Sequence, residues 1–103
     1  MKYIVDIDGT ICKKNESGDY TFCEPYRERI AFFNSLVEQG HEVVYYTARG
    51  SVSGRDWTKE TMDQFIEWGV QCSAVIHGKM PYDVWIDDKA VNADEFFQRL
   101  GIE

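Results

Sequence analysis

The stretch that decides the fold is YIVDIDGT, residues 3–10, in which an apolar run leads into two aspartates and a glycine. In an extended chain Asp6 and Asp8 project from the same face, because side chains alternate along a strand. Gly9 then permits a tight turn that a residue with a β-carbon would resist. Two crowded carboxylates are costly unless a cation compensates them, and divalent cations prefer such oxygen ligands. The stretch therefore predicts a first strand that ends in a metal site.

The rest of the chain alternates short apolar runs with amphipathic segments, which indicates parallel strands joined by helical crossovers. Glycine, proline and side-chain capping residues mark the helix ends. In the second helix we expect Met62, Phe65 and Ile66 to face inward. The polar segment 11–24 is expected to form a flap. The predicted strands are 2–7, 42–47, 72–77 and 83–87, and the predicted helices are 25–40, 56–69 and 92–101.

Polar residues with phosphate and metal chemistry lie at the predicted strand ends, where open parallel sheets bind their ligands. Thr47, Lys79, Arg49 and the backbone amides after Asp6 could donate to a phosphate, Arg49 in a bidentate manner. Neighbouring residues of a strand face opposite ways, so only one of the two acids that end the fourth strand is expected to meet the metal directly. The acids at strand ends are Asp6, Asp8, Asp87 and Asp88.

Three stretches, DIDGT, YYTARG and HGKMPYDVWIDD, resemble in order and content the motifs of the haloacid dehalogenase-like phosphohydrolases. The resemblance spans nearly the whole chain. It implies a single domain over residues 1–103 with a three-layer α/β/α Rossmann-like fold and strand order 4-1-2-3. The intervals between the motifs leave no room for a cap domain.

The resemblance also implies a role for each matching residue. Asp6 would be the nucleophile that forms an aspartyl-phosphate, and Asp8 the acid and base. Thr47, Lys79, Gly9 and Arg49 would hold the phosphoryl group. Asp6, the Asp8 main-chain carbonyl and Asp87 would hold Mg²⁺. Asp88 is assigned to the metal site as well, although the chain departs from the family pattern here: it has IDDK, with Val91 where many members carry a second, more widely spaced acid.

The expected activity is hydrolysis of a phosphomonoester, and two analogies give different substrates. Short capless proteins associated with capsular polysaccharide biosynthesis suggest a sugar phosphate or related metabolite. The 3′-phosphatase domain of phage-type polynucleotide kinases suggests a nucleic acid. The net charge of −7 favours the sugar phosphate, because nucleic-acid enzymes usually carry more basic residues. A neighbouring subunit could cover the open site.

Two readings of another class stay open. A phospho-acceptor signalling domain also uses Asp, Thr and Lys at strand ends, although the order of the acids here argues against it. A catalytically silent binding or oligomerisation module is the other.

Charge and composition also bear on the location of the protein. The net charge of −7 gives no general attraction to nucleic acid or to an anionic membrane. No apolar segment approaches the roughly 20 residues that a membrane span needs. Three cysteines without a C-x-x-C pair indicate reduced thiols that serve packing. We expect a cytoplasmic protein.

Overall fold

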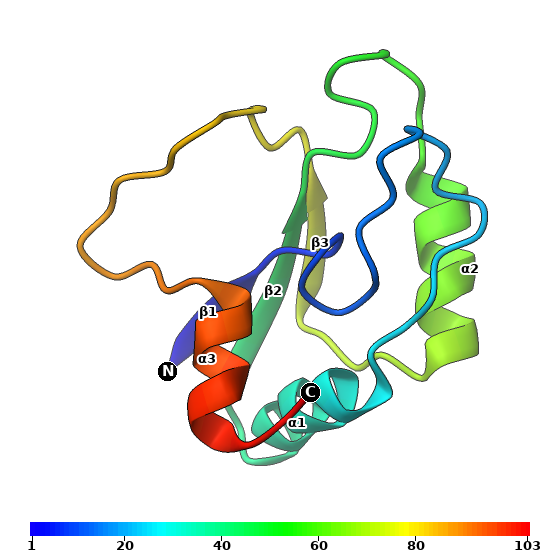
Figure 1. The fold of residues 1–103 in the computed structure, drawn as a ribbon. Coiled ribbons are helices and arrows are strands. Elements are labelled where there is room, and N and C mark those ends of the chain that lie inside the picture. The colour runs from blue at the N-terminus through cyan, green and yellow to red at the C-terminus, as the bar shows by residue number, and fades with distance from the viewer.

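The computed structural model describes residues 1–103 and alternates strands with helices (Figure 1). It is a small mixed α/β structure with a parallel sheet, as predicted. The longest helix has 12 residues, and no helix combines the length and hydrophobicity that a membrane crossing requires. In chain order the elements are β1 (Lys2–Val5), α1 (Arg27–Glu38), β2 (Glu42–Thr47), α2 (Thr58–Trp68), β3 (Ala74–His77) and α3 (Ala93–Leu100).

The three strands form one sheet in the order β1-β2-β3, and both pairings are parallel. In the register, Ile4 lies beside Val44, and Val44 beside Ala74. This agrees with the 1-2-3 part of the predicted order. Because the strands are parallel, their carboxyl ends meet at one edge of the sheet, where the candidate site residues follow them.

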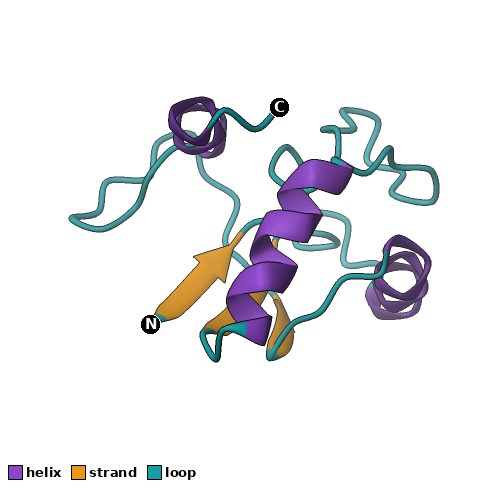
Figure 2. Ribbon diagram, turned by 90° about the horizontal axis from the view of Figure 1, so that it is seen from below, coloured by secondary structure: helices purple, strands orange, loops and turns teal.

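All three helices pack against the same face of the sheet. Tyr45 of β2 lies 6.3 Å from Phe33 of α1 and 5.1 Å from Phe65 of α2, between ring centroids. Phe97 of α3 joins this cluster at 5.5 Å from Phe33. On the opposite face the alternate residue Ile4 is 58% exposed. The structure therefore has helices on one face of the sheet (Figure 2), and the three-layer arrangement stays a prediction.

The C-terminal ends of two helices agree with the capping residues read from the sequence. Gly69 and Gly101 end α2 and α3 in the left-handed conformation, at φ 67° and 70°. Asp56 is not the N-cap of α2: that position is Trp57, which makes no side-chain cap, and the Asp56 carboxylate accepts a local hydrogen bond from the Thr58 amide at 2.9 Å. The predicted inward face of α2 is wrong in part, because Met62 and Ile66 are exposed. Its buried stripe is instead Thr61, Gln64, Phe65 and Trp68.

The cap of α3 gives a stability prediction. The Asn92 side chain accepts a hydrogen bond from the Glu95 amide at 3.2 Å, which satisfies a donor that the helix itself leaves free. Asn92→Ala is expected to lower the free energy of unfolding by about 1 kcal/mol, measured by urea denaturation. The exposed Gln98 in the same helix provides the control, because Gln98→Ala removes no cap. Equal effects of the two substitutions would contradict the capping role.

The predicted fourth strand is not present, and residues 83–87 are irregular in the structure. Local hydrogen bonds explain this difference. The Asp87 carboxylate accepts from the Lys89 amide at 2.9 Å and from Trp85 Nε1 at 3.3 Å, and such local bonds compete with strand pairing. Val84 and Ile86 are consequently 75% and 92% exposed. The segment runs outward between β3 and α3, and β1 is left with an unpaired edge (Figure 1).

Candidate functional site

Asp6 and Asp8 follow the first strand, which ends at Val5 and not at residue 7 as predicted. Gly9 has φ 85° and its amide donates to the Cys12 carbonyl at 2.8 Å, which closes a tight turn directly after Asp8. The Gly9 amide is therefore occupied within the turn. Thr10 follows, and its hydroxyl donates to Asp6 Oδ2 at 3.5 Å.

Lys79 meets Asp6 although the two residues lie 73 positions apart in the chain. Lys79 Nζ is 3.3 Å from Asp6 Oδ1. The Lys79 side chain is nearly buried, and that of Asp6 is 37% exposed. Burial raises the pKa of Asp6 above its usual value, and the opposing effect of the Lys79 charge does not cancel it. Asp6 is thus a partly exposed carboxylate that is paired with Lys79 and whose charged form is disfavoured by burial.

Thr47 ends β2 next to this pair and is almost completely buried. Its carbonyl accepts from the Lys79 amide at 3.0 Å, and its hydroxyl oxygen accepts from the Arg49 amide at 3.1 Å. The loop after β3 is also tied to the loop after β2, because Ser51 Oγ donates to the Lys79 carbonyl at 2.8 Å. Thr47 therefore fixes the backbone positions of Lys79 and Arg49.

The side chain of Arg49 is bonded to protein groups and is not free for the phosphate contact that the sequence suggests. Its side chain is fully buried, and it holds Asp8 in a bidentate ion pair, with Nε to Oδ2 and Nη2 to Oδ1 both at 2.9 Å. Nη1 donates to Thr61 at 3.1 Å and to Gln64 at 2.7 Å, and Nη2 also approaches Cys23 Sγ at 3.7 Å. A guanidinium has five N–H groups, and protein acceptors occupy all of them here. Its predicted role as a phosphate ligand is therefore replaced by a role in holding Asp8.

The hydrogen bonds around Arg49 shift the pKa values of Arg49 and of the neighbouring Cys12. Burial alone would lower the pKa of Arg49, but the hydrogen bonds and the charge of Asp8 outweigh burial and raise it. Cys12 lies beside the pair and its thiol donates to Asp8 Oδ1 at 3.4 Å. Burial and the nearby Asp8 charge raise the pKa of Cys12, so it remains a thiol.

Asp8, Cys12 and Cys23 form a cluster whose ligand atoms lie within 4.8 Å of one another. Arg49 Nη2 contacts all three, at 2.9 Å from Asp8 Oδ1, 3.9 Å from Cys12 Sγ and 3.7 Å from Cys23 Sγ. A positive charge therefore already occupies the position that a soft metal ion would take.

Asp87 and Asp88 are not brought to the first strand in this structure. Both are exposed, and Asp87 makes the local bonds described above. The bond from the Lys89 amide is the main cause that lowers the pKa of Asp87. Two aromatic residues of the same loop lie over Lys79, with Nζ 5.3 Å from the Tyr82 ring and 5.6 Å from the Trp85 ring.

Sequence reasoning missed Thr61 and Gln64, which bind Arg49. Their spacing in the sequence could have identified them, because they are polar residues three positions apart on the same helix face as Phe65 and Trp68. A polar pair within a buried helical stripe needs hydrogen-bond partners, and here the partner is the buried guanidinium.

Comparison with known proteins supports the fold. No protein-family model matches the sequence, and no curated protein matches it. The crystal structure of a structural-genomics target from Vibrio cholerae is similar to this chain, with a TM-score of 0.80 and 28% identity. The match covers 92% of this chain and 85% of that one. That protein is described without an activity or a ligand, so the likeness bears on architecture.

Proposed function

We propose that this chain is a Mg²⁺-dependent phosphatase of the haloacid dehalogenase-like type, with Asp6 as nucleophile. The observation that carries the proposal is the contact between Lys79 Nζ and Asp6 Oδ1 at 3.3 Å, at the carboxyl edge of a parallel sheet. A second acid, Asp8, follows two residues later. Lys79 and Asp6 lie 73 positions apart in the chain, so their contact depends on the tertiary fold and not on local structure.

The chemistry would run in two steps. Asp6 attacks the phosphorus of a phosphomonoester, and the bond to the leaving alcohol breaks as Asp8 gives that oxygen a proton. Water then attacks the aspartyl-phosphate, Asp8 takes a proton from the water, and Asp6 and inorganic phosphate are released. Lys79 would stabilise the negative charge on the phosphoryl oxygens in both steps. Asp8 would have to enter the first step protonated on one oxygen, and the proton taken from water in the second step restores that form. Arg49 would keep Asp8 in place through its other oxygen.

The residues at the first strand fit a magnesium ion. Asp6 offers a hard oxygen ligand that is 37% exposed, and a bound cation would favour the charged form of Asp6 that burial disfavours. The Asp8 main-chain carbonyl would be the second protein ligand. Bound Mg²⁺ would supply charge neutralisation at the phosphoryl oxygens.

The third ligand requires the segment 83–87 to approach β1. We propose that it pairs with the free edge of β1 as a fourth strand, which would give the order 4-1-2-3. Pairing would cover Val84 and Ile86, which are largely exposed in this structure. Burying an aliphatic side chain contributes roughly 1.5–3 kcal/mol, enough to compete with the local bonds of Asp87. The three-layer arrangement remains a prediction of the resemblance.

This part of the proposal predicts unequal roles for the two acids. Asp87→Asn is expected to raise the Mg²⁺ concentration for half-maximal activity at least about tenfold. Asp88→Asn is expected to raise it less, since adjacent strand residues face opposite ways. Magnesium titrations of phosphate release measure both. If neither substitution changes the magnesium requirement, the fourth strand does not supply a ligand.

For the substrate we propose a sugar phosphate or a related small phosphorylated metabolite. The net charge of −7 disfavours a polyanionic nucleic acid. Tyr82, which precedes the segment 83–87, lies with its ring 5.3 Å from Lys79 Nζ, and aromatic rings of this kind bind the apolar faces of sugars. The same ring could stack on a base, which is what favours a polynucleotide 3′-phosphatase as the second candidate.

A substrate panel tests the proposal. Phosphate release would be measured from several sugar phosphates and from a 3′-phosphorylated oligonucleotide, with Mg²⁺ or with a chelator. We expect magnesium-dependent turnover that the chelator abolishes and added Mg²⁺ restores, and higher kcat/KM for a sugar phosphate. Preference for the oligonucleotide would select the second candidate. The absence of turnover by folded protein on every substrate would favour a binding or oligomerisation module.

A further inference from the structure

The buried guanidinium of Arg49 joins three parts of the molecule that are separate in sequence. It binds Asp8 after β1, and it also binds Thr61 and Gln64 of α2. The flap, residues 11–24, covers it from a third side. The Tyr20 ring lies 4.8 Å from the guanidinium carbon, and Cys23 Sγ lies 3.7 Å from Nη2. The position of Asp8 thus depends on groups from α2 and from the flap.

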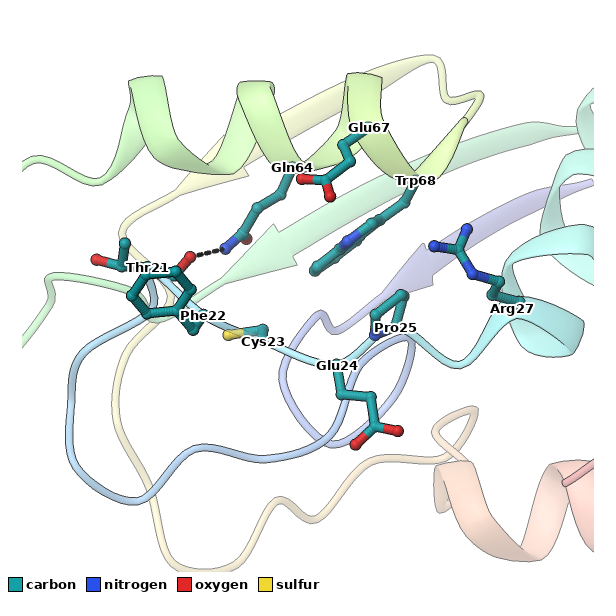
Figure 3. Close-up of a pocket in the computed structure, with 9 residues that line it drawn as sticks. All are labelled: Thr21, Phe22, Cys23, Glu24, Pro25, Arg27, Gln64, Glu67 and Trp68. Atoms are coloured by element: carbon teal, nitrogen blue, oxygen red, sulfur yellow. Dashed lines mark hydrogen bonds between the residues drawn. The ribbon is translucent and has the colours of Figure 1, made fainter.

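Gln64 contacts both Arg49 and the flap. Its side chain is buried, and Oε1 accepts from Arg49 Nη1 at 2.7 Å. Its Nε2 donates to the Tyr20 carbonyl, and to the Thr21 carbonyl at 3.5 Å. Figure 3 shows Gln64 reaching from α2 to the flap across the wall of a pocket of about 360 Å³. One amide group therefore uses its acceptor on Arg49 and its donor on the flap.

Backbone hydrogen bonds hold the two ends of the flap, whereas its middle is held by side-chain contacts with Gln64 and Trp57. The Lys13 amide donates to the Glu24 carbonyl at 2.8 Å, and the Tyr26 amide to the Ile11 carbonyl at 2.8 Å. Near the middle, Tyr20 packs edge-on against Trp57 of the loop before α2, at 5.2 Å between ring centroids. The Gln64 bonds and this aromatic contact hold the flap over Arg49.

We propose that Gln64 is a positioning residue that couples closure of the flap to the orientation of Asp8. With the flap closed, the Gln64 acceptor and the Tyr20 ring hold the guanidinium against Asp8, so that one carboxyl oxygen keeps its bond to Arg49 while the other can carry the proton that is transferred. When the flap opens, Gln64 loses its carbonyl partners and water reaches Arg49, so Asp8 loses its fixed orientation. The inference rests on the proposed function, in which Asp8 transfers a proton to the leaving group.

Leaving-group dependence tests this coupling. A p-nitrophenolate leaves without needing a proton, whereas the alkoxide of glycerol 2-phosphate needs one, so loss of Asp8 orientation should affect the second substrate selectively. For Gln64→Ala we expect kcat/KM to fall about 10–100-fold with glycerol 2-phosphate and less than about threefold with p-nitrophenyl phosphate. Gln98→Ala, an exposed glutamine of α3, is the control and should change neither. Equal losses on both substrates, or none, would overturn the proposal.

A second variant separates the two ends of the amide. Gln64→Glu keeps an acceptor for Arg49 but places a carboxylate oxygen against the Tyr20 and Thr21 carbonyls, where a donor is needed. We expect amide hydrogen exchange over residues 20–23 to become at least about tenfold faster in Gln64→Glu and Gln64→Ala, and to remain unchanged in Gln98→Ala. Wild-type exchange in Gln64→Glu would show that the flap is not held through Gln64.

The exchange measurement also separates two kinds of failure. If the wild-type protein hydrolyses neither ester, the proposed function fails, and with it the consequence for proton transfer. The contact between Gln64 of α2 and the flap is then tested only by the amide hydrogen exchange rates of residues 20–23. If the wild type is active and only the substrate selectivity is missing, the coupling to Asp8 is wrong and the proposed function stands.

Discussion

Replacing Asp6 by asparagine is expected to lower magnesium-dependent phosphate release by at least about 1,000-fold, because an amide cannot form the aspartyl-phosphate. Shape and size are kept, and Lys79 stays in place to bind the phosphoryl group. The loss should therefore appear in kcat, with a smaller change in KM. Steady-state assays on the preferred substrate of the panel measure both constants.

The control for Asp6→Asn is Asp19→Asn, which removes the same charge from an exposed position in the flap. It should leave kcat within about threefold of the wild type. Circular dichroism would establish that both variants are folded. An Asp6→Asn protein that keeps a tenth or more of the wild-type kcat would contradict the nucleophile assignment.

Replacing Arg49 by methionine is expected to lower the free energy of unfolding by about 3 kcal/mol, because it leaves buried partners without a cation. Asp8, whose side chain is 17% exposed, loses both hydrogen bonds of its ion pair. Gln64 Oε1 and Thr61 Oγ1 lose their donors as well. Urea denaturation, with extrapolation to water, measures the change.

Two further variants show whether the loss of stability comes from the buried ion pair. Combining Arg49→Met with Asp8→Asn should recover part of the lost stability, because the unpaired charge is removed with its partner. Lys59→Met breaks an exposed ion pair with Asp63 within α2 and should leave the urea midpoint nearly unchanged. If Arg49→Met were as mild as Lys59→Met, the buried ion pair would not contribute to the fold.

The sequence was sufficient to predict the parallel sheet and most helix ends. Hydrophobic periodicity and capping residues depend on neighbours within a few positions, and Asn92 forms the expected cap of α3. The fourth strand was different, because pairing with β1 competes with local bonds of Asp87 that no periodicity reports. The inward face of α2 was partly wrong for a related reason. Its buried positions include the polar residues Thr61 and Gln64, which are buried because they accept hydrogen bonds from Arg49.

In the candidate site, the sequence named Asp6 and Lys79 separately, as a strand-end acid and as a possible phosphate donor, and the structure places Lys79 Nζ 3.3 Å from Asp6 Oδ1. The direction of the strands is enough to bring the ends of β1 and β3 to the same edge of the sheet. The location of Arg49 needs the direction of one long side chain, which depends on acceptors in α2 and the flap. Sequence position two residues after Thr47 suits a phosphate contact and an ion pair with Asp8 equally well. Only the packing of Thr61, Gln64 and Tyr20 around the guanidinium decides between them.

The most direct test of the central claim is to look for a phosphoryl group on Asp6. Wild-type protein and Asp8→Asn would be mixed with Mg²⁺ and substrate, quenched in acid within the first turnover and digested for mass spectrometry. We expect the peptide from Tyr3 to Lys13 to gain the mass of one phosphoryl group, more persistently in Asp8→Asn, and never in Asp6→Asn. Turnover of substrate by the wild type, with no phosphoryl group on this peptide in either protein at any time, would contradict the account.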